Sequence, residues 1–577
     1  MNKLSQWLLK QEQAQSAKSF AAFRIAFCLF LLMFIAHVSY YRPLIFNTIP
    51  HLAYNPFPAK LFLLLWALVT GFLLAGWQTK MASVINYLFI VIATFLFSNA
   101  GCGSFNDDLL RIGGFLLVIM PVGRNFSVDV VVKTVRFGAQ QVKASSSLYY
   151  LAALLVSLGL MYLASGITKL YSPMWAAGLG LWIPASMPYN KWHSVDFFLN
   201  MEWLMKGINY VTMLWELLFL FMLFSKKWRL TFAATGVFFH LVIAILFPFP
   251  LLSFGAIAFY LLFIPDSFWD RFQSAPISLV INPANQRQQI FARALQAIHR
   301  NTVVTHHPHP AMTINGTTQR SNRKTAIYGL NQTLLGKTYS WMLEVEFIRL
   351  MVLAFADDGI HITSTYPEPA LKTSFKRFWL AVFCFMLLSV QVFYSSYHLF
   401  SKMKGNTPKT AELKNGYHVR KDITDFSLKP SNLFRTLFGL NARGVFLDHS
   451  NTGTKTVFAV IHLNKQGDTT WLPFFDRNGY ALGMNMNLAW SRYTFNSVCS
   501  GMVPNPLELE KALWLWTEKQ RVKRQNIDFY VLKRTYIYPK RFEPDYQKKM
   551  AGLPWLEIGI AGWQNGTFRY TAGASAE

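Results

Sequence analysis

The segment Phe20-Ala-Ala-Phe-Arg-Ile-Ala-Phe-Cys-Leu-Phe-Leu-Leu-Met-Phe-Ile-Ala-His-Val-Ser-Tyr40 indicates the class of this chain. A transmembrane helix needs about 20 mainly apolar residues, and this run reaches that length. It is too long for the apolar part of a signal peptide, and no small-residue cleavage site follows it. We therefore interpret it as a helix that is retained in a membrane.

The composition agrees with an integral membrane protein that also has water-facing parts. The 577 residues are 53% hydrophobic and only 14% charged, and the mean hydropathy is +0.25. The formal charge of +27 is better explained by basic loops beside membrane helices than by nucleic-acid binding. The four cysteines show no metal-binding or disulfide spacing, so we predict neither a metal site nor a disulfide framework.

Apolar stretches of roughly membrane-spanning length recur along the chain. They fall at 20–40, 60–77, 82–99, 107–122, 148–170, 208–225, 229–247, 251–265 and 377–399. We predict a mainly α, polytopic helical bundle with about eight spans followed by one more. Basic residues of the 124–143 loop and the 226–229 turn fall on the side of the N-terminus, which predicts a cytoplasmic N-terminus.

The predicted domains follow from these spans. Residues 1–270 form the transmembrane domain, 271–376 a cytoplasmic α/β insertion, 377–399 a further transmembrane helix, and 400–577 an extracytoplasmic α+β domain. In the insertion we expect a strand at 278–282 and a helix at 286–299. In the last domain we expect a hairpin at 454–462 and 469–475, a helix at 506–524 and a strand at 527–538.

Ionisable residues inside predicted spans are costly and therefore suggest functional sites. Arg24 lies near a span end, where its side chain is expected to reach lipid headgroups. The remaining ones are Asp107, Asp108, Arg111, Lys169, Glu216 and His240. In the predicted topology, several of these residues lie in the outer half of the bilayer. This common depth favours one polar cavity that opens outward.

Two alternatives remain for Lys169. Tyr162, Ser165, Gly166 and Lys169 share one helical stripe, so the lysine could face a cavity as a desolvated, neutral amine that acts as a base. It could equally reach the headgroups from a helix end. Asp107 and Arg111 have the i, i+4 spacing of an ion pair, either structural or cavity-lining. His240 is either an interhelical hydrogen-bonding residue or a base.

The loop after Lys169 is rich in aromatic residues and prolines. It contains Trp175, Trp182, Tyr189 and Trp192, interspersed with Pro173, Pro184 and Pro188. Such a segment is typical of a membrane interface or of a re-entrant loop. We expect it either to cover a cavity that accepts a lipid-soluble molecule or simply to form an aromatic belt.

The sequence resembles the horizontally transferred transmembrane (HTTM) domain family, which includes the vitamin K-dependent gamma-carboxylases. Over roughly 15–270 the resemblance rests on ordered motifs: Phe23-Arg-Ile-Ala-Phe27, Asn106-Asp-Asp-Leu-Leu-Arg111, Tyr162-Leu-Ala-Ser-Gly-Ile-Thr-Lys-Leu170 with Trp175, and Trp215-Glu-Leu-Leu218 leading to Phe239-His-Leu241 and Tyr260-Leu-Leu-Phe-Ile-Pro265. The resemblance implies that Lys169 is the base that deprotonates reduced vitamin K or another quinol. Oxygenation of the quinol would then yield the base for carboxylation of a peptide glutamate.

Two departures limit what the resemblance implies. The animal carboxylases have paired lysines where this chain has Thr168 and Lys169, and an Asn-His pair where it reads Ala82-Ser-Val-Ile-Asn-Tyr87. Because of these two departures, proton abstraction from a quinol is better supported than glutamate carboxylation.

The insertion faintly resembles thioredoxin-like domains, but Ile281-Asn-Pro-Ala-Asn-Gln-Arg-Gln-Gln289 lacks both of their cysteines.

The resemblance therefore implies a bacterial inner-membrane protein that acts on a quinol. Lys169 and His240 are the candidate catalytic residues, and the candidates for lining the cavity or binding substrate are Asp107, Asp108, Arg111, Tyr162, Trp175 and Glu216. The expected partners are the lipid bilayer, a lipid-soluble quinone and an extracytoplasmic peptide or protein. The alternative is a non-catalytic lipid- or quinone-binding module with a periplasmic interaction domain.

Overall fold

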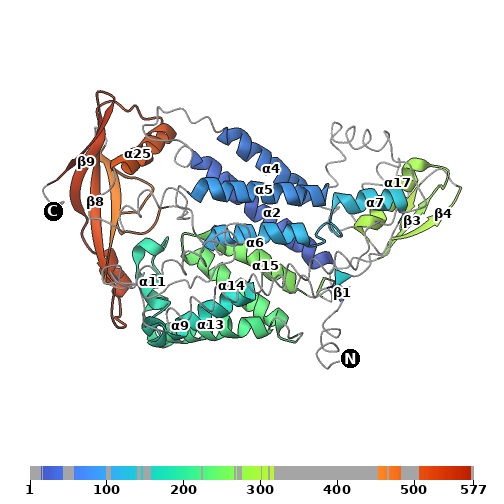
Figure 1. Cartoon of the computed structure of the whole chain (residues 1–577), viewed down its shortest axis with the longest axis horizontal. Helices are drawn as coiled ribbons and strands as arrows, with labels where there is room; N and C mark the ends of the chain where they lie inside the picture. Colours follow the sequence, from blue (N-terminus) through green and yellow to red (C-terminus); the bar gives the residue numbers. More distant parts are fainter. Residues whose placement is uncertain are drawn as a thin grey trace, which may run out of the picture.

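The structure is a computed structural model, and helices predominate in the part of the chain that it describes (Figure 1). The described residues are 14–15, 17–42, 58–98, 105–138, 145–146, 158–222, 225, 227–264, 268–269, 276–299, 302–308, 312–316, 453–463, 467–482 and 506–573. Strands form a two-, a three- and a five-stranded sheet. The predicted helix at 377–399 lies outside the described residues.

The first helix that the structure describes is α2 (Ala17–Tyr40). One of its faces carries a buried phenylalanine stripe at the i, i+3, i+7 spacing of a helix face: Phe20, Phe23, Phe27, Phe30 and Phe34. The opposite face exposes apolar side chains, with Leu29 50% and Met33 42% exposed. A helix that is apolar on all sides is typical of a membrane environment.

Further helices complete the bundle. They are α4 (Ala59–Ala75), α5 (Thr79–Ser98), α6 (Phe105–Ile119), α9 (Leu160–Leu170), α13 (Glu202–Met222), α14 (Arg229–Leu246) and α15 (Pro250–Tyr260). Neighbours in sequence pack together as α4 with α5, α5 with α6, and α14 with α15, whereas α9 packs on α13. The core is largely aromatic and aliphatic, as the composition predicts.

Three of the described helices are long and apolar enough to cross a membrane: Lys18–Tyr40, Glu202–Met222 and Arg229–Leu246. Shorter apolar helices occupy Ala59–Ala75, Thr79–Ala93 and Pro250–Phe263. The expectation of about eight spans plus one is therefore met only in part among the described residues. Ala59–Ala75 and Pro250–Phe263 are short for a span, because an α-helix rises about 1.5 Å per residue and the hydrocarbon core is about 30 Å thick.

Short helices form the aromatic segment after Lys169. They are α10 (Pro173–Ala176), α11 (Trp182–Ser186), the 3-10 helix η2 (Pro188–Asn190) and α12 (Asp196–Leu199). Trp182 packs on Phe542 with ring centroids 4.9 Å apart, and the Tyr189 and Tyr538 hydroxyls are 2.6 Å apart. These aromatic side chains therefore pack under the C-terminal domain, which differs from the expected aromatic belt.

The C-terminal domain contains an antiparallel sheet of order β10-β9-β8-β6-β7. Its strands are β6 (Thr454–Leu463), β7 (Thr469–Trp471), β8 (Ile527–Ile537), β9 (Leu556–Gln564) and β10 (Thr567–Ala572), accompanied by α25 (Pro506–Gln520) and α26 (Tyr546–Ala551). The predicted hairpin, helix and strand are confirmed. The β9–β10 hairpin was not predicted.

The insertion contains a β-α-β unit. In it β3 (Ile277–Ile281), α17 (Gln286–Ile298) and β4 (Thr302–His306) follow one another, and β3 pairs in parallel with β4. A short strand, β5 (Thr313–Ile314), pairs antiparallel with β3. The predicted strand and helix are confirmed, whereas β4 falls in a polar stretch for which no strand was predicted.

The two mixed domains lie at opposite ends of the helical bundle (Figure 1). At one end the Ser19 hydroxyl donates to the Ile264 carbonyl just before the insertion. At the other end Lys519 of α25 lies 4.4 Å from the centre of the Tyr40 ring. Helix α2 thus runs from the insertion end to the C-terminal domain.

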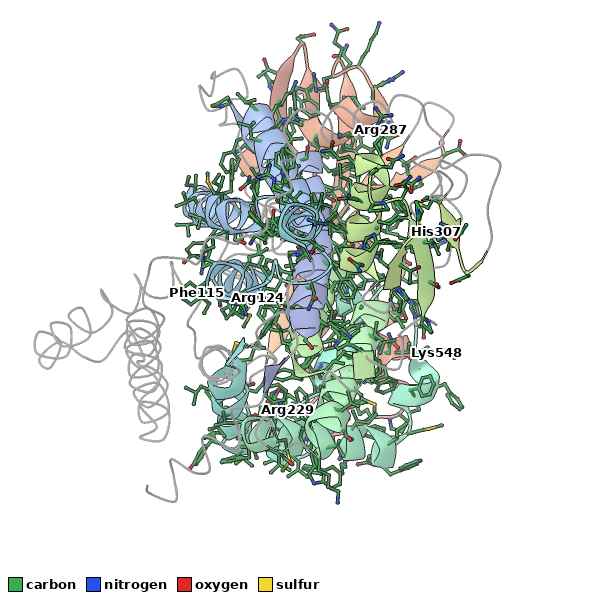
Figure 2. The ribbon with its side chains drawn as sticks, turned by 90° about the vertical axis from the view of Figure 1, so that its right-hand side faces the viewer. Phe115, Arg124, Arg229, Arg287, His307 and Lys548 are labelled. Carbon is green, nitrogen blue, oxygen red and sulfur yellow. The ribbon has the colours of Figure 1, made fainter. Side chains whose placement is uncertain are left out.

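The insertion end carries basic residues on separate parts of the chain. Figure 2, viewed from this end, labels Arg124 of the turn after α6, Arg229 of α14 and Arg287 of α17. A short amphipathic helix, α7 (Val128–Phe137), lies there too, and Arg293 of α17 donates to its Val135 carbonyl at 3.0 Å. The insertion therefore packs directly against the basic end of the bundle.

Candidate functional site

Lys169 is buried in the helical bundle, with only 3% of its surface exposed. Its ammonium donates to Oε1 of Glu216, a buried residue of α13. The Trp175 ring completes the surroundings of the amine, with its centre 4.4 Å from Nζ. Lys169 thus forms a buried ion pair inside the bundle, which differs from the alternative in which its amine reaches the headgroups.

Close packing of α9 on α13 brings the two charges together. A Cβ atom on Gly166 would lie 3.0 Å from Leu217 Cγ and 3.2 Å from the Leu217 backbone nitrogen. The small residue therefore lets the two helices approach. The stripe that contains Tyr162, Ser165 and Gly166 is buried as a whole. At Gly166 it serves helix packing, whereas the sequence suggested a cavity wall.

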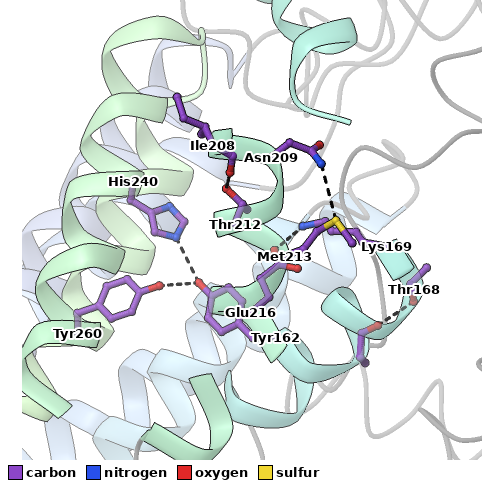
Figure 3. Close-up of polar contacts among 11 residues, drawn as sticks. Tyr162, Thr168, Lys169, Ile208, Asn209, Thr212, Met213, Glu216, His240 and Tyr260 are labelled. Carbon is purple, nitrogen blue, oxygen red and sulfur yellow. Dashed lines mark hydrogen bonds and ion pairs between the residues drawn. The ribbon is translucent and has the colours of Figure 1, made fainter. Parts of the chain in front are cut away.

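A chain of hydrogen bonds runs through Tyr162. Its hydroxyl lies 3.2 Å from His240 Nε2 and 2.8 Å from the Tyr260 hydroxyl. The Glu216 carboxylate acts electrostatically on both tyrosine hydroxyls. Helices α9, α13, α14 and α15 thus contribute one polar cluster, Lys169, Glu216, Tyr162, His240 and Tyr260 (Figure 3). We call it the Lys169 cluster.

The Lys169 cluster contains polar atoms with unused hydrogen-bonding capacity. Among the described residues, no hydrogen-bond partner meets Glu216 Oε2, His240 Nδ1 or Trp215 Nε1, although all three atoms are buried. Buried polar groups are nearly always hydrogen-bonded, so such atoms require an explanation. Glu216 Oε2 and His240 Nδ1, both in the Lys169 cluster, therefore retain unused hydrogen-bonding capacity, and so does the neighbouring Trp215 Nε1.

Among the other predicted site residues, Trp175 lies beside the Lys169 cluster, whereas Asp108 and Arg111 pair with each other on α6. Trp175 belongs to the cluster surroundings, and its carbonyl accepts a hydrogen bond from Asn209 Nδ2 at 3.0 Å. Arg111 pairs with Asp108 at 3.0 Å, the i, i+3 spacing, whereas the sequence suggested Asp107. The Asp107 side chain lies outside the described part of the chain.

The Asp108–Arg111 pair lies on α6, next to α5. Arg111 acts electrostatically on Tyr87 of α5, and α5 packs on α6. Helix α6 packs on α5, α15 and α2, whereas α9 packs on α13. The expectation that this pair and Lys169 line one cavity stays a prediction.

Arg24 corrects another expectation. It is fully buried, and its guanidinium donates to the Val122 carbonyl at 2.8 Å and to the Phe126 carbonyl. These carbonyls lie in the turn after α6, where backbone acceptors lack helical partners. Arg24 thus fixes the α6–α7 turn to α2, and the prediction that it reaches headgroups is wrong.

The sequence did not single out Tyr260 as a site residue. The sequence feature that could have identified it is a tyrosine in an otherwise apolar stretch, because a buried tyrosine hydroxyl normally has a hydrogen-bond partner. No group of three or more His, Cys, Asp or Glu side chains in the described ranges is arranged to hold a metal ion.

Comparisons with protein-family models, curated proteins and solved structures found no match for this chain. The functional argument therefore rests on the residues and their geometry.

Proposed function

We propose that this chain is a multi-pass membrane protein whose N-terminus and insertion are cytoplasmic and whose C-terminal domain is extracytoplasmic. The exposed apolar residues of its long helices support this assignment, with Val211 and Phe221 each 60% and Phe238 68% exposed. The basic end of the bundle, beside the insertion, is the side that the positive-inside rule assigns to the cytoplasm. We also propose that the membrane is a bacterial inner membrane, and that the chain crosses it with about eight helices followed by one more.

We further propose that the Lys169 cluster removes a proton from a lipid-soluble weak acid of the reduced-quinone type. The observation that carries this proposal is a lysine and a glutamate buried together inside an apolar bundle, with one carboxylate oxygen free. A charge pair in such a place is expensive and is expected where proton or ion chemistry occurs. The resemblance to HTTM proteins suggests the same substrate class.

The residues divide the work as follows. Glu216 Oε2 accepts a hydrogen bond from the substrate hydroxyl, and Lys169 compensates the charge of the carboxylate through Oε1. The substrate proton passes to the Glu216–Lys169 pair, in which the resemblance assigns the base to Lys169. Trp175 excludes water from the amine, and a dry site strengthens these charge interactions.

The tyrosine–histidine chain orients His240 within the cluster. Tyr162 lies between His240 and Tyr260, and its hydroxyl occupies Nε2 of the imidazole. His240 Nδ1 then remains available to a substrate oxygen. Reduced quinone, when bound, supplies the acidic hydroxyl; the chain supplies acceptors and charge compensation.

Glutamate carboxylation is the less supported half of the family reaction. The region Ala82–Tyr87 lacks the family histidine. Its Asn86 accepts a hydrogen bond from Trp66 Nε1 at 2.8 Å, which joins α4 to α5. This asparagine side chain serves helix packing, so our proposal stops at the quinol step.

The alternative is a non-catalytic module that binds a lipid or quinone and presents its C-terminal domain to a periplasmic partner. One observation favours it: Tyr162 and Trp215 are part of the aromatic packing of the bundle, with ring centroids 5.1 Å apart. The cluster would then be a polar brace between helices.

The test is to incubate the purified protein in lipid nanodiscs with reduced vitamin K or a ubiquinol analogue and oxygen. We expect epoxide formation in the wild type, its loss in Lys169→Ala and Glu216→Gln, and wild-type rates in Lys206→Ala. Lys206 is a matched control because it pairs with Glu202 on the exposed surface of α13. If the wild type binds quinone but neither it nor any variant forms epoxide, the result supports the non-catalytic module instead.

A further inference from the structure

The C-terminal domain and the segment 182–200 share one junction. Their hydrophobic side chains form a common core. Hydrogen bonds cross the junction from Val195 N to Gln547 Oε1, from Asn200 Nδ2 to Asp545 Oδ1, from Ala481 N to the Lys191 carbonyl, and between the Tyr189 and Tyr538 hydroxyls. Any opening of the junction must break these contacts together.

Lys191 lies inside this junction with its amine unpaired. The residue is 0% exposed, and no hydrogen-bond partner among the described residues reaches its Nζ. Lys169 is also buried, but it has Glu216 as a hydrogen-bonded counter-ion. A buried ammonium without such a partner is strongly unfavourable, so the neutral amine is the form that suits Lys191.

The charged and titratable groups around Lys191 come from three elements. Asp196 of α12 acts electrostatically on the lysine, but its Oδ2 accepts from Ser194 and its Oδ1 meets no described partner. Tyr480 and Asp476 come from the turn before Ala481, and Asp196 acts electrostatically on Tyr480. On β8, Tyr536 lies beside Arg534, which the Asn478 and Arg477 carbonyls hold.

We propose that seating the C-terminal domain on the 182–200 segment expels a proton from Lys191, so that the junction is a proton-linked contact that acid loosens. In the open junction the lysine side chain reaches water and is protonated. In the closed junction it is buried and neutral. This inference is independent of the chemistry at Lys169, and either can fail without the other.

The direction of the pH effect follows from the two protonation states. Burial lowers the pKa of Lys191 to about 7, which Asp196 partly offsets, whereas an exposed lysine has a pKa of about 10.4. Between these values the open junction binds a proton that the closed junction lacks. Opening therefore becomes up to about tenfold more favourable for each unit that the pH falls, and it levels off below about pH 7.

Hydrogen exchange tests this inference on the whole protein in nanodiscs. The Ala481 N–H crosses the junction to the Lys191 carbonyl, so its protection factor, corrected for intrinsic exchange, reports the opening equilibrium. Between about pH 7 and 10 we expect protection in the wild type to rise by up to about tenfold per pH unit. A flat profile in the wild type overturns the inference, with or without any variant.

Variants assign the effect to Lys191. Lys191→Met keeps the apolar stem and removes the charge, so we expect higher protection near pH 7 and no slope. Lys206→Met should retain the wild-type slope. Asp196→Asn removes the charge that favours the ammonium, and its slope should extend below pH 7. A Lys191→Met variant that keeps the slope contradicts our assignment.

Discussion

Two buried lysines show how a counter-ion determines the form of the same side chain. Lys169 donates to Glu216 and lies over Trp175, so the charge on its amine is compensated. Lys191 has only the more distant Asp196 and no hydrogen-bond partner among the described residues. The first environment stabilises an ion pair, and the second favours the neutral amine.

At Lys169 we predict strong coupling with Glu216. Lys169→Met leaves the carboxylate buried and unpaired, and it should lower the free energy of unfolding by about 3–5 kcal/mol. The double variant Lys169→Met with Glu216→Gln should recover much of that loss because no charge remains. Thermal unfolding in one detergent measures both. If the losses of the two single variants add up in the double variant, the pair is not coupled.

Tyr162 should matter more for stability than Tyr260. Tyr162→Phe deprives both His240 and the Tyr260 hydroxyl of a partner, and it should cost about 1–3 kcal/mol. Tyr260→Phe breaks only the hydrogen bond to Tyr162 and should cost about 1 kcal/mol. Equal losses in the two unfolding curves would show that Tyr162 does not join the two side chains.

At the scale of elements, Arg24 links α2 to the turn after α6. Arg24→Met removes a charged donor from two backbone carbonyls, and it should cost about 1.5–3 kcal/mol for each bond that water does not replace. The exposed Lys227→Met is the control and should leave the unfolding temperature unchanged. Increased proteolysis in the 120–128 turn would locate the loss, and an unaltered turn would contradict this role for Arg24.

The sequence predicted those elements whose periodicity is strong. The strand at β8 alternates in burial and the helix α17 has a polar and an apolar face, so both were recognised. The hairpin of β9 and β10 was missed although Asn565 and Gly566 both adopt positive φ at its turn. An Asn-Gly pair between two strand-like runs is the usual signal of such a hairpin.

The site could be predicted residue by residue but not as a cluster. Lys169, Glu216 and His240 stood out as charged or polar groups in apolar helices. Their partners depended on which helices pack together, and α9 packs on α13, which follows it only after the aromatic segment. Likewise, Lys191 gave no signal, because its burial arises only when the distant C-terminal domain covers it.

For the whole molecule, the separation of the insertion from the C-terminal domain predicts labelling from opposite sides. In a background without native cysteines, Lys548→Cys should react with an impermeant thiol reagent from the extracytoplasmic side. Arg287→Cys should react only after the membrane is permeabilised. Both side chains lie in the exposed parts of the two domains. Equal labelling of intact spheroplasts would exclude the proposed orientation.

The proposal as a whole depends on proton abstraction at the Lys169 cluster. The measurement is epoxide formation from reduced vitamin K or a ubiquinol analogue by the nanodisc-embedded protein with oxygen, in the wild type, Lys169→Ala, Glu216→Gln and Lys206→Ala. We predict product in the wild type and Lys206→Ala, and none in the two cluster variants even when these remain folded. Equal activity in Lys169→Ala would contradict the assigned base.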